Sequence, residues 1–377
     1  MKKVLFVATV VRKHINVFHL PYLKWFKENG YETHVCARND YENKEECVIP
    51  YCDRFFDLPF ERSPFKVNNL NIYKQLKILV EKNNYDIIHC HTPMGGALTR
   101  IAAKKSRKNG TRVIYTAHGF HFFEGAPLKN WFIYFPIEKW LSKYTDCLIT
   151  INQEDYQIAN RKFKTKSIRL VNGVGISINK FKPYSEEKKL ELRREYGYKD
   201  KDFILIYAGE LSYRKNQDLL IKTIHKLSNR IPNIKLLLVG AGGLLNQYEQ
   251  QVIKLGIKDK VEFLGFRNDV SKLMGLSDIA VSSSKQEGLP VNIMEAMATG
   301  LPLVVTDCRG NRDLVKNRIN GFVVGINDID DFASKVEELY LDNELRQIFS
   351  QENLKFVNRY TMEKVMPVME TVYKSIQ

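Results

Sequence analysis

The chain has 377 residues, 44% of them hydrophobic and 11% aromatic, which is more than one hydrophobic core usually serves and excludes extensive disorder. Its formal net charge of +15 favours an anionic partner such as nucleic acid, an acidic membrane surface or a phosphorylated small molecule. Six cysteines lie scattered without a C-x-x-C pair, so neither a zinc knuckle nor a disulfide framework is indicated and a reducing, cytoplasmic setting is expected.

The N-terminus pairs two lysines with a short apolar run. That run, residues 4–11, is not followed by a small-residue cleavage site, so we interpret it as a buried strand and not as a secretory signal. No apolar stretch approaches the roughly 20 residues that span a bilayer. Any membrane contact is therefore expected to be peripheral.

Short apolar, β-branched stretches alternate with longer amphipathic segments along the whole chain. They lie at 3–10, 31–38, 85–92, 112–119, 146–153 and 167–174, and again at 202–210, 234–242, 260–266, 278–284, 302–308 and 321–327. This alternation predicts an α/β protein with two Rossmann-like, doubly wound parallel sheets.

The domain boundary is expected within the Gly-, Asn- and Pro-containing stretch 171–189, where charge rises and periodicity lapses. We assign residues 1–175 to the first domain and 176–357 to the second. Residues 358–377 form an amphipathic helical segment that either completes the second domain or crosses back to the first.

Ligands of doubly wound sheets bind at the carboxyl ends of the strands, so the polar residues that follow each predicted strand are candidates. Glu287 comes after the strand at 278–284 and is followed by Gly288, Leu289 and Pro290, a residue suited to the first position of a helix. The free amides of a helix start favour phosphate or hydroxyl oxygens. Glu295, more than one turn further on, offers an acceptor carboxylate to a diol.

The segment "EGLPVNIMEAMATGLPLVVTD", with its Glu-x7-Glu spacing, closely resembles the donor-site signature of retaining GT-B glycosyltransferases that use nucleotide-sugars, of the glycosyltransferase family 4 type. The resemblance extends over nearly the whole chain, through "AGELSYRKNQDLLI" and "VNGVGISINKF". The N-terminal stretch "HCHTPMGGALTRIAA" resembles the branch found in bacterial capsule and exopolysaccharide gene clusters. The resemblance implies two Rossmann-like domains facing across a cleft, the first binding the acceptor and the second the nucleotide-sugar.

Site roles follow from the resemblance by position. Glu295 is expected to bind the ribose hydroxyls and Glu287 the hydroxyls of the donor sugar. The amides around Gly288 and Leu289 would help to hold the sugar and the diphosphate.

Basic residues after other strands complete the expected donor site. Arg214 and Lys215, in the loop after the strand that ends at Gly209, match the pair that neutralises the leaving diphosphate, and Phe266 and Arg267 correspond to the base-binding region. Charge supplied in this way stabilises the transition state electrostatically. No metal ion and no other cofactor is therefore expected.

Two departures from the family pattern stand out. The loop after the first strand contains no glycine before Gly30, although many relatives have a glycine-rich loop there. Glu210 stands where relatives often carry an arginine, so more of the positive charge falls to Arg214 and Lys215.

The histidines leave alternatives open. His118 follows the predicted strand at 112–117, where the resemblance implies a histidine near the donor sugar or phosphate; the other reading is a hydrogen-bonded core histidine. His89 and His91 alternate with Cys90 and share one face of a strand. No third metal ligand is evident near them in the sequence, so we expect packing and not metal binding.

A membrane contact is suggested by residues 129–144, "KNWFIYFPIEKWLSKY", which mix aromatic and basic side chains. They read either as an amphipathic helix packed on the sheet and broken near Pro136, or as an interfacial segment. A basic cluster, Lys104, Lys105, Arg107 and Lys108, belongs to the same predicted domain. We expect the protein on the inner face of the cell membrane.

The resemblance thus implies transfer of a hexosyl or N-acetylhexosaminyl group from a nucleoside diphosphate, expected to be UDP, to a polyprenyl-diphosphate-linked glycan in capsule or exopolysaccharide synthesis. One alternative is a non-hydrolysing UDP-sugar 2-epimerase on the same fold. The other is a basic nucleic-acid-binding protein, but no recognised binding module is present, so a nucleic acid is not expected as a partner.

Overall fold

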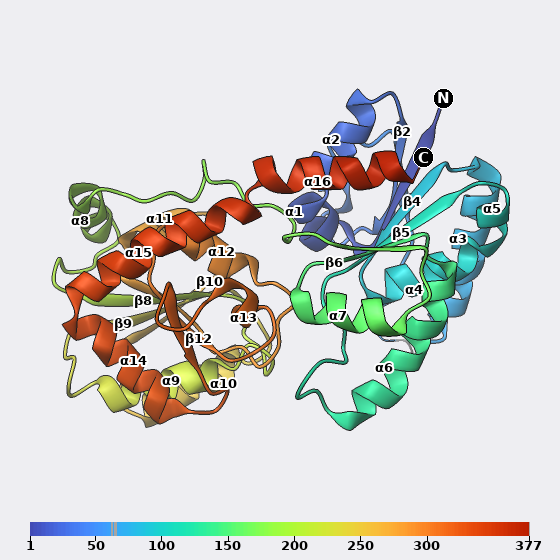
Figure 1. Ribbon diagram of the computed structural model, residues 1–377. Helices are drawn as coiled ribbons and strands as arrows, with labels where there is room; N and C mark the ends of the chain where they lie inside the picture. The colour runs from blue at the N-terminus through green and yellow to red at the C-terminus, as the bar shows by residue number, and fades with distance from the viewer. Residues whose placement is uncertain (62, 64–65, 377) are drawn as a thin grey trace. The chain divides into compact units, whose positions relative to one another are not determined.

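The computed structural model describes residues 1–61, 63 and 66–376, and its contacts divide the chain into two units (Figure 1). The first unit comprises Met1–Gly175 and Met362–Gln377, and the second Ile176–Thr361. Of the two courses left open for the final segment, the structure shows the return to the first unit. It starts at Met362 and not at 358, because Thr361 bridges to Ile176 and the Ile176 amide donates to the Tyr360 carbonyl at 3.0 Å.

The first unit is built on a seven-stranded parallel sheet with the strand order β3-β2-β1-β4-β5-β6-β7. The central strands are buried on both faces, which is why their sequences read as continuous apolar runs and not as an alternation. The strands are β1 (Lys3–Val10), β2 (Glu32–Arg38), β3 (Arg54–Asp57), β4 (Ile87–His91), β5 (Arg112–Ala117), β6 (Cys147–Thr150) and β7 (Ser167–Leu170).

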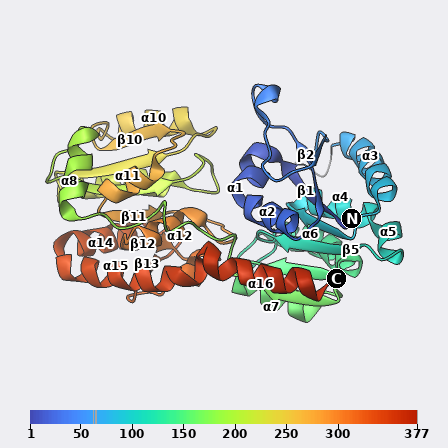
Figure 2. The same cartoon turned by 90° about the horizontal axis from the view of Figure 1, so that it is seen from above.

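Two hydrophobic clusters pack on the two faces of this sheet. One brings α2 and α16 together (Figures 1 and 2). In this cluster the ring of Tyr373 stacks on Trp25 with centroids 5.4 Å apart. The other packs α3, α4 and α7 against the strands. The helices of this unit are α1 (Asn16–Phe18), α2 (Leu20–Glu28), α3 (Asn68–Asn83), α4 (Pro93–Ala102), α5 (Lys104–Lys108), α6 (Leu128–Leu141), α7 (Gln153–Lys162) and α16 (Met362–Ser375), with a π-helical turn at Val11–Ile15 and 3₁₀ turns at Lys44–Glu46 and Ser142–Tyr144.

The second unit repeats the architecture with a six-stranded parallel sheet in the order β10-β9-β8-β11-β12-β13. Figure 1 shows α9, α10 and α14 on one face and α11 and α12 on the other. The strands are β8 (Phe203–Ala208), β9 (Ile234–Val239), β10 (Val261–Gly265), β11 (Ile279–Ser282), β12 (Leu303–Thr306) and β13 (Gly321–Val324). The helices are α8 (Glu186–Glu195), α9 (Gln217–Leu227), α10 (Leu245–Lys254), α11 (Val270–Leu276), α12 (Val291–Ala298), α13 (Asn311–Leu314), α14 (Ile329–Leu341) and α15 (Asn343–Val357), with a 3₁₀ turn at Asn358–Tyr360.

Two local features differ from the sequence predictions. The strand β3 was not predicted, since it is only four residues long and places two aromatic residues between charged ones at a partly exposed edge. Helix α6 runs without interruption through Pro136, where one of the two interpretations of this segment placed a break. A proline removes one N–H from the helical ladder, and the helix continues beyond it to Leu141.

Candidate functional site

Glu287 lies at the carboxyl edge of the second sheet, in the loop that leads from β11 to α12. The helix begins at Val291, and Pro290 precedes it as the N-cap with an extended backbone (φ −75°, ψ 115°). The sequence prediction that Pro290 occupies the first helical position is therefore off by one residue. At either position the missing N–H costs nothing, because the first amides of a helix have no helical partner.

The Glu287 carboxylate is held by side chains from two loops. The Lys215 ammonium donates to Oε1 at 2.5 Å, the Ser284 hydroxyl donates to the same oxygen at 2.6 Å, and an Arg214 amino group lies 3.4 Å from Oε2. Tyr207, at the end of β8, shares a hydrogen bond of 2.8 Å with Ser284. The structure thus brings the predicted pair Arg214 and Lys215 to Glu287, which lies more than 70 positions further along the sequence.

The electrostatics of this group favour an ionised pair. Burial by itself raises the pKa of Glu287, but the charges of Lys215 and Arg214 outweigh it and hold that pKa below its usual value. For Lys215, burial lowers the pKa, yet the neighbouring Tyr207 and Glu287 leave it above its usual value. Both groups therefore stay charged at neutral pH.

The loop after β12 contacts the backbone of Glu287 and Gly288. The buried Arg309 donates from Nε to the backbone carbonyl of Glu287 at 3.0 Å. Gly310 has a φ of +82°, and a Cβ at this position would lie 2.7 Å from the Gly288 carbonyl oxygen. Sequence reasoning missed Arg309, although its place directly after a predicted strand was an available signal.

Glu295 lies on α12 and is partly buried. Burial raises the pKa of its carboxyl to about 7, against a small opposing effect of Lys180. Unlike Glu287, this acid has no short ion pair among the described residues. The Glu295 carboxyl therefore titrates near neutral pH.

Other predicted donor residues lie at the same edge of the sheet. Gly209 follows β8, and its carbonyl oxygen would lie 2.2 Å from a Cβ at Gly240, which explains the glycine after β9. Leu289, next to Gly288 in the loop, is buried.

Phe266 and Arg267 stand apart from Glu287. They follow β10, the first strand in the order β10-β9-β8-β11, so three strand intervals of about 4.8 Å separate them from the end of β11. Phe266 is 73% exposed, and Arg267 forms a bidentate ion pair with Asp269 at 2.8 and 2.5 Å. The exposed ring of Phe266 is therefore available to a ligand, whereas the Arg267 guanidinium is already paired with Asp269.

His118 belongs to the first unit, where it follows β5. Four histidines meet there, His14, His19, His91 and His118, and each presents a ring nitrogen within 4.8 Å of the nitrogens of the others. Burial lowers the pKa of His118 to about 4 and those of His19 and His91 well below the usual value, with mutual repulsion adding to the effect for the last two. Sequence reasoning noticed His91 and His118 but not their convergence with the loop after β1.

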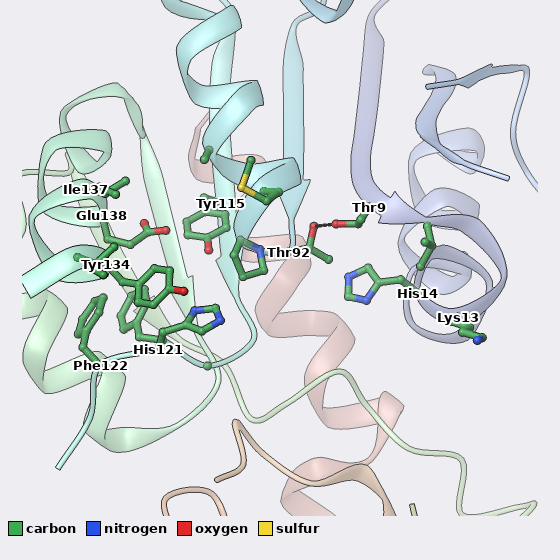
Figure 3. A pocket seen from close by; sticks show the side chains of 17 residues that line it. Thr9, Lys13, His14, Thr92, Tyr115, His121, Phe122, Tyr134, Ile137 and Glu138 are labelled. Atoms are coloured by element: carbon green, nitrogen blue, oxygen red, sulfur yellow. Dashed lines mark hydrogen bonds between the residues drawn. The ribbon is translucent and has the colours of Figure 1, made fainter. Parts of the chain in front are cut away.

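A cavity of about 440 Å³ opens next to this cluster (Figure 3). Its walls come from the ends of β1 and β4, the loop at 119–122 and helix α6, and His14 contributes to both the cavity and the cluster. The hydroxyls of Thr9 and Thr92 lie 2.7 Å apart and tie the two strand ends together. Tyr134 and His121 stack with centroids 4.6 Å apart, which gives the cavity an aromatic wall.

Two Rossmann-like parallel α/β units, each with polar residues at the carboxyl edge of its sheet, define a GT-B protein. Residues 188–356 match the family model described as "Glycosyl transferases group 1", and residues 3–152 match "Glycosyl transferase 4-like". The chain belongs to this glycosyltransferase family.

Two curated relatives set the scale of the similarity. The chain is 43% identical to the "Putative glycosyltransferase EpsD" of Bacillus subtilis over 99% of its length and 97% of that protein. It is 30% identical over 82% of its own length, and 82% of the relative, to an Escherichia coli protein named "UDP-Gal:alpha-D-GlcNAc-diphosphoundecaprenol alpha-1,3-galactosyltransferase".

Solved structures agree on the fold. Anabaena HepE, crystallised in complex with UDP-glucose, superposes with a TM-score of 0.79 at 20% identity, covering 99% of this chain and 100% of that one. Sucrose-phosphate synthase from Thermosynechococcus elongatus gives 0.80 at 17% identity, with 100% and 99% covered. Throughout the described ranges, none of the helices has the length and apolarity needed to cross a bilayer.

Proposed function

We propose that this glycosyltransferase moves a sugar from a UDP-sugar to a polyprenyl-diphosphate-linked glycan, with retention of anomeric configuration, during capsule or exopolysaccharide synthesis. The observation that carries the proposal is the charged cluster at the edge of the second sheet, in which Lys215, Arg214 and Ser284 hold the buried Glu287 carboxylate. The name of the E. coli relative specifies a UDP-sugar and a diphosphoundecaprenol acceptor. HepE, with the same fold, was crystallised with UDP-glucose.

On the donor side, each group has a distinct proposed role. Glu295 accepts hydrogen bonds from the ribose hydroxyls, and Glu287 accepts them from the hydroxyls of the sugar. Arg214 and Lys215 stabilise the negative charge that grows on the diphosphate as the glycosidic bond breaks. The amides around Gly288 and Leu289 assist them.

Three further groups complete the donor side. Gly209 leaves space after β8 for the diphosphate. Phe266 and Arg267 flank the base, and the exposed ring of Phe266 is available for stacking. We expect the transfer step itself to need no metal at the diphosphate, because the two basic side chains supply the charge that a metal would supply.

Retention is proposed through displacement on one face of the sugar. The oxygens of Glu287 are already engaged by Lys215, Ser284 and Arg214, an arrangement that favours an acceptor of hydrogen bonds over a covalent nucleophile. The acceptor oxygen then forms its bond to C1 on the side from which the diphosphate departs, and the departing diphosphate oxygen takes the acceptor proton. His118, neutral at physiological pH, serves as a hydrogen-bond donor near the sugar or phosphate.

The acceptor is proposed to bind the first unit, at the cavity beside α6. Its aromatic wall suits a sugar ring or the first isoprene units of a lipid carrier. Large apolar side chains on the same helix point outward: Phe132 is 78% exposed and Leu128 75%. Together with the lysines of α5, this surface is proposed to dock on the anionic inner face of the cell membrane.

Product analysis tests the proposal. The purified enzyme is incubated with a panel of UDP-sugars, with and without a polyprenyl-diphosphate-linked acceptor, and the products are examined by NMR. We expect a new glycosidic bond only when acceptor is present, with the anomeric configuration of the donor. An inverted product would refute the mechanism, and conversion of a UDP-sugar alone into its 2-epimer would show the epimerase instead.

A further inference from the structure

We propose that His14, His19, His91 and His118 form a binding site for a divalent transition-metal ion of the zinc class. The four rings come from three separate segments at the carboxyl edge of the first sheet: the turn and helix after β1, the last residue of β4, and the residue after β5. This site goes beyond the proposed transfer reaction, which assigns no metal to the protein.

The spacing of the nitrogens fits a metal ion. Nε2 of His118 lies 3.4 Å from Nδ1 of His91, and two nitrogens bound to one tetrahedral zinc at 2.0–2.1 Å are about 3.3–3.4 Å apart. All four rings offer a nitrogen within 4.8 Å of the others.

The two innermost histidines have polar atoms that the described part of the protein leaves unsatisfied. Neither ring nitrogen of His19 has a hydrogen-bond partner among the described residues, and the same holds for Nε2 of His91. Both side chains are 1% exposed, and their rings stack with centroids 3.7 Å apart. A buried polar atom without a hydrogen-bond partner is destabilising, and an ion bound by one ring nitrogen of His19 would remove that penalty at that nitrogen.

The neighbouring His89 provides a useful contrast. It lies on the same face of β4 as His91, but both its ring nitrogens are engaged, with Tyr373 at 3.0 Å and Thr116 at 2.8 Å. This histidine is therefore a packed, hydrogen-bonded core residue. The four histidines of the proposed site differ from it because they face one another.

The ligand chemistry selects the class of metal. The four groups are imidazoles, with neither carboxylate nor thiolate among them, and burial favours the neutral form that binds metals. Imidazole suits zinc, copper, nickel and cobalt, whereas magnesium and calcium prefer oxygen ligands. Four protein ligands leave no open position on a tetrahedral ion, which indicates a structural site and not a catalytic one.

Such an ion would fasten the loop after β1 to the ends of β4 and β5. This loop carries a π-helical turn and contains no glycine before Gly30, and a bound metal would fix its conformation. Binding through Nε2 of His118 leaves its Nδ1–H to donate a hydrogen bond, and the proposed role of His118 toward the donor is therefore retained.

Cobalt titration of the tag-free, metal-stripped protein under a non-thiol reductant tests the site. We expect one equivalent of Co²⁺ to bind with the visible absorption of tetrahedral coordination and no thiolate-to-cobalt charge transfer. His14→Ala and His118→Ala, both at partly exposed positions, should each lose this spectrum, while the control His225→Ala on the surface of α9 should keep it. No stoichiometric binding by the parent protein, or a spectrum unchanged in both site variants, would overturn the proposal.

A measurement on the unaltered protein covers the case in which a variant does not fold. Zinc X-ray absorption of the one-equivalent complex should show about four nitrogen ligands at roughly 2.0–2.1 Å. Sulfur at roughly 2.3 Å would assign the metal to the free cysteines and overturn the histidine site.

Discussion

The Lys215 ammonium lies 2.5 Å from Oε1 of Glu287, and both side chains are about nine-tenths buried. Because the pair is charged and enclosed, removing either partner leaves the other buried without its nearest opposite charge. Function and stability are therefore coupled at this point, and experiments on either residue have to separate the two.

Lys215→Ala is expected to lower kcat more than it raises the donor KM, because the lysine's interaction with the diphosphate strengthens as charge grows on the leaving group. The same change leaves the Glu287 carboxylate with only Ser284 and Arg214 and should cost up to about 3–5 kcal/mol of unfolding free energy. Steady-state kinetics below the unfolding transition and urea denaturation measure the two effects. An unchanged kcat would rule out the catalytic role.

The double variant Lys215→Met/Glu287→Gln separates stability from catalysis. With no buried charge left unpaired, it should regain most of the stability lost in Lys215→Ala. Its kcat should nevertheless stay low. Recovery of kcat along with stability would mean that the ion pair serves only the fold.

Arg214 offers a cleaner probe, because its side chain is 46% exposed and lies 3.4 Å from Glu287. Exposed pairs contribute about 0–1 kcal/mol to stability, so Arg214→Gln should leave the melting temperature nearly unchanged. If Arg214 donates to the diphosphate, kcat/KM should fall by about 10- to 100-fold, the equivalent of about 1.5–3 kcal/mol. The control Lys222→Gln, an exposed residue of α9 with the same change in charge, should keep full activity.

Burial raises the pKa of Glu295 to about 7. We therefore expect this residue to affect both stability and UDP binding in a way that depends on pH. A carboxyl with a raised folded-state pKa stabilises the protein below its unfolded pKa and loses that contribution as pH rises to about 7. Above pH 7 the ionised, buried group costs about 3 kcal/mol. Glu295→Gln should therefore stabilise the unliganded protein at pH 8 and make little difference at pH 4.

The same substitution should weaken UDP binding, since an amide is a poorer acceptor for the ribose diol than a carboxylate. In the parent protein, UDP should bind more tightly as pH rises through 7, and binding at pH 6.5 should release a proton. Calorimetry in buffers of different ionisation enthalpy measures that proton. Affinity that is equal in parent and variant at pH 8 would contradict the ribose contact.

The sequence predicted those parts of the fold that depend on local pattern. Buried parallel strands appear as apolar runs, and all but β3 were recognised; β3 failed because its four residues carry charges at both ends. The position of Glu287 after a strand also predicted its neighbourhood, since the carboxyl ends of parallel strands share one edge.

Contacts between loops that are distant in the sequence could not be predicted from the hydrophobic pattern of the sequence. Arg309 reaches the Glu287 carbonyl from the loop after β12, and the histidines at 14 and 19 meet His91 and His118 only through an irregular π-helical turn. Neither loop has a periodic hydrophobic pattern from which its path could be predicted. His91 was therefore judged to lack further ligands, although its neighbours in space are three more histidines.

The structure narrows the set of basic side chains on α5 that are available for membrane docking. Arg107 does not belong to it, because its guanidinium forms a bidentate pair with Asp146 at 2.8 Å and is mostly buried. The exposed charge of α5 lies on Lys104, Lys105 and Lys108; the Lys105 ammonium also lies 3.9 Å from the Glu81 carboxylate. The basic cluster proposed from the sequence is therefore smaller by one residue.

We expect the protein to sediment with vesicles containing phosphatidylglycerol but not with vesicles of phosphatidylcholine alone, and added salt should release it. Each lysine near an anionic surface contributes about 1 kcal/mol. Replacing Lys104, Lys105 and Lys108 with glutamine should therefore reduce the partition by roughly 100-fold. Phe132→Ser on α6 should reduce it further, because the exposed ring inserts among the headgroups.

The control for this prediction is a triple variant with the same loss of charge in the second unit, Lys222→Gln, Lys254→Gln and Lys258→Gln, all at exposed positions. If docking depends on net charge alone, both triple variants should lose the vesicles equally, and a defined docking face would be excluded. If the α5 and α6 surface is the contact, only the first triple variant should be released. Both should bind UDP with unchanged affinity, since none of these lysines belongs to the proposed donor site.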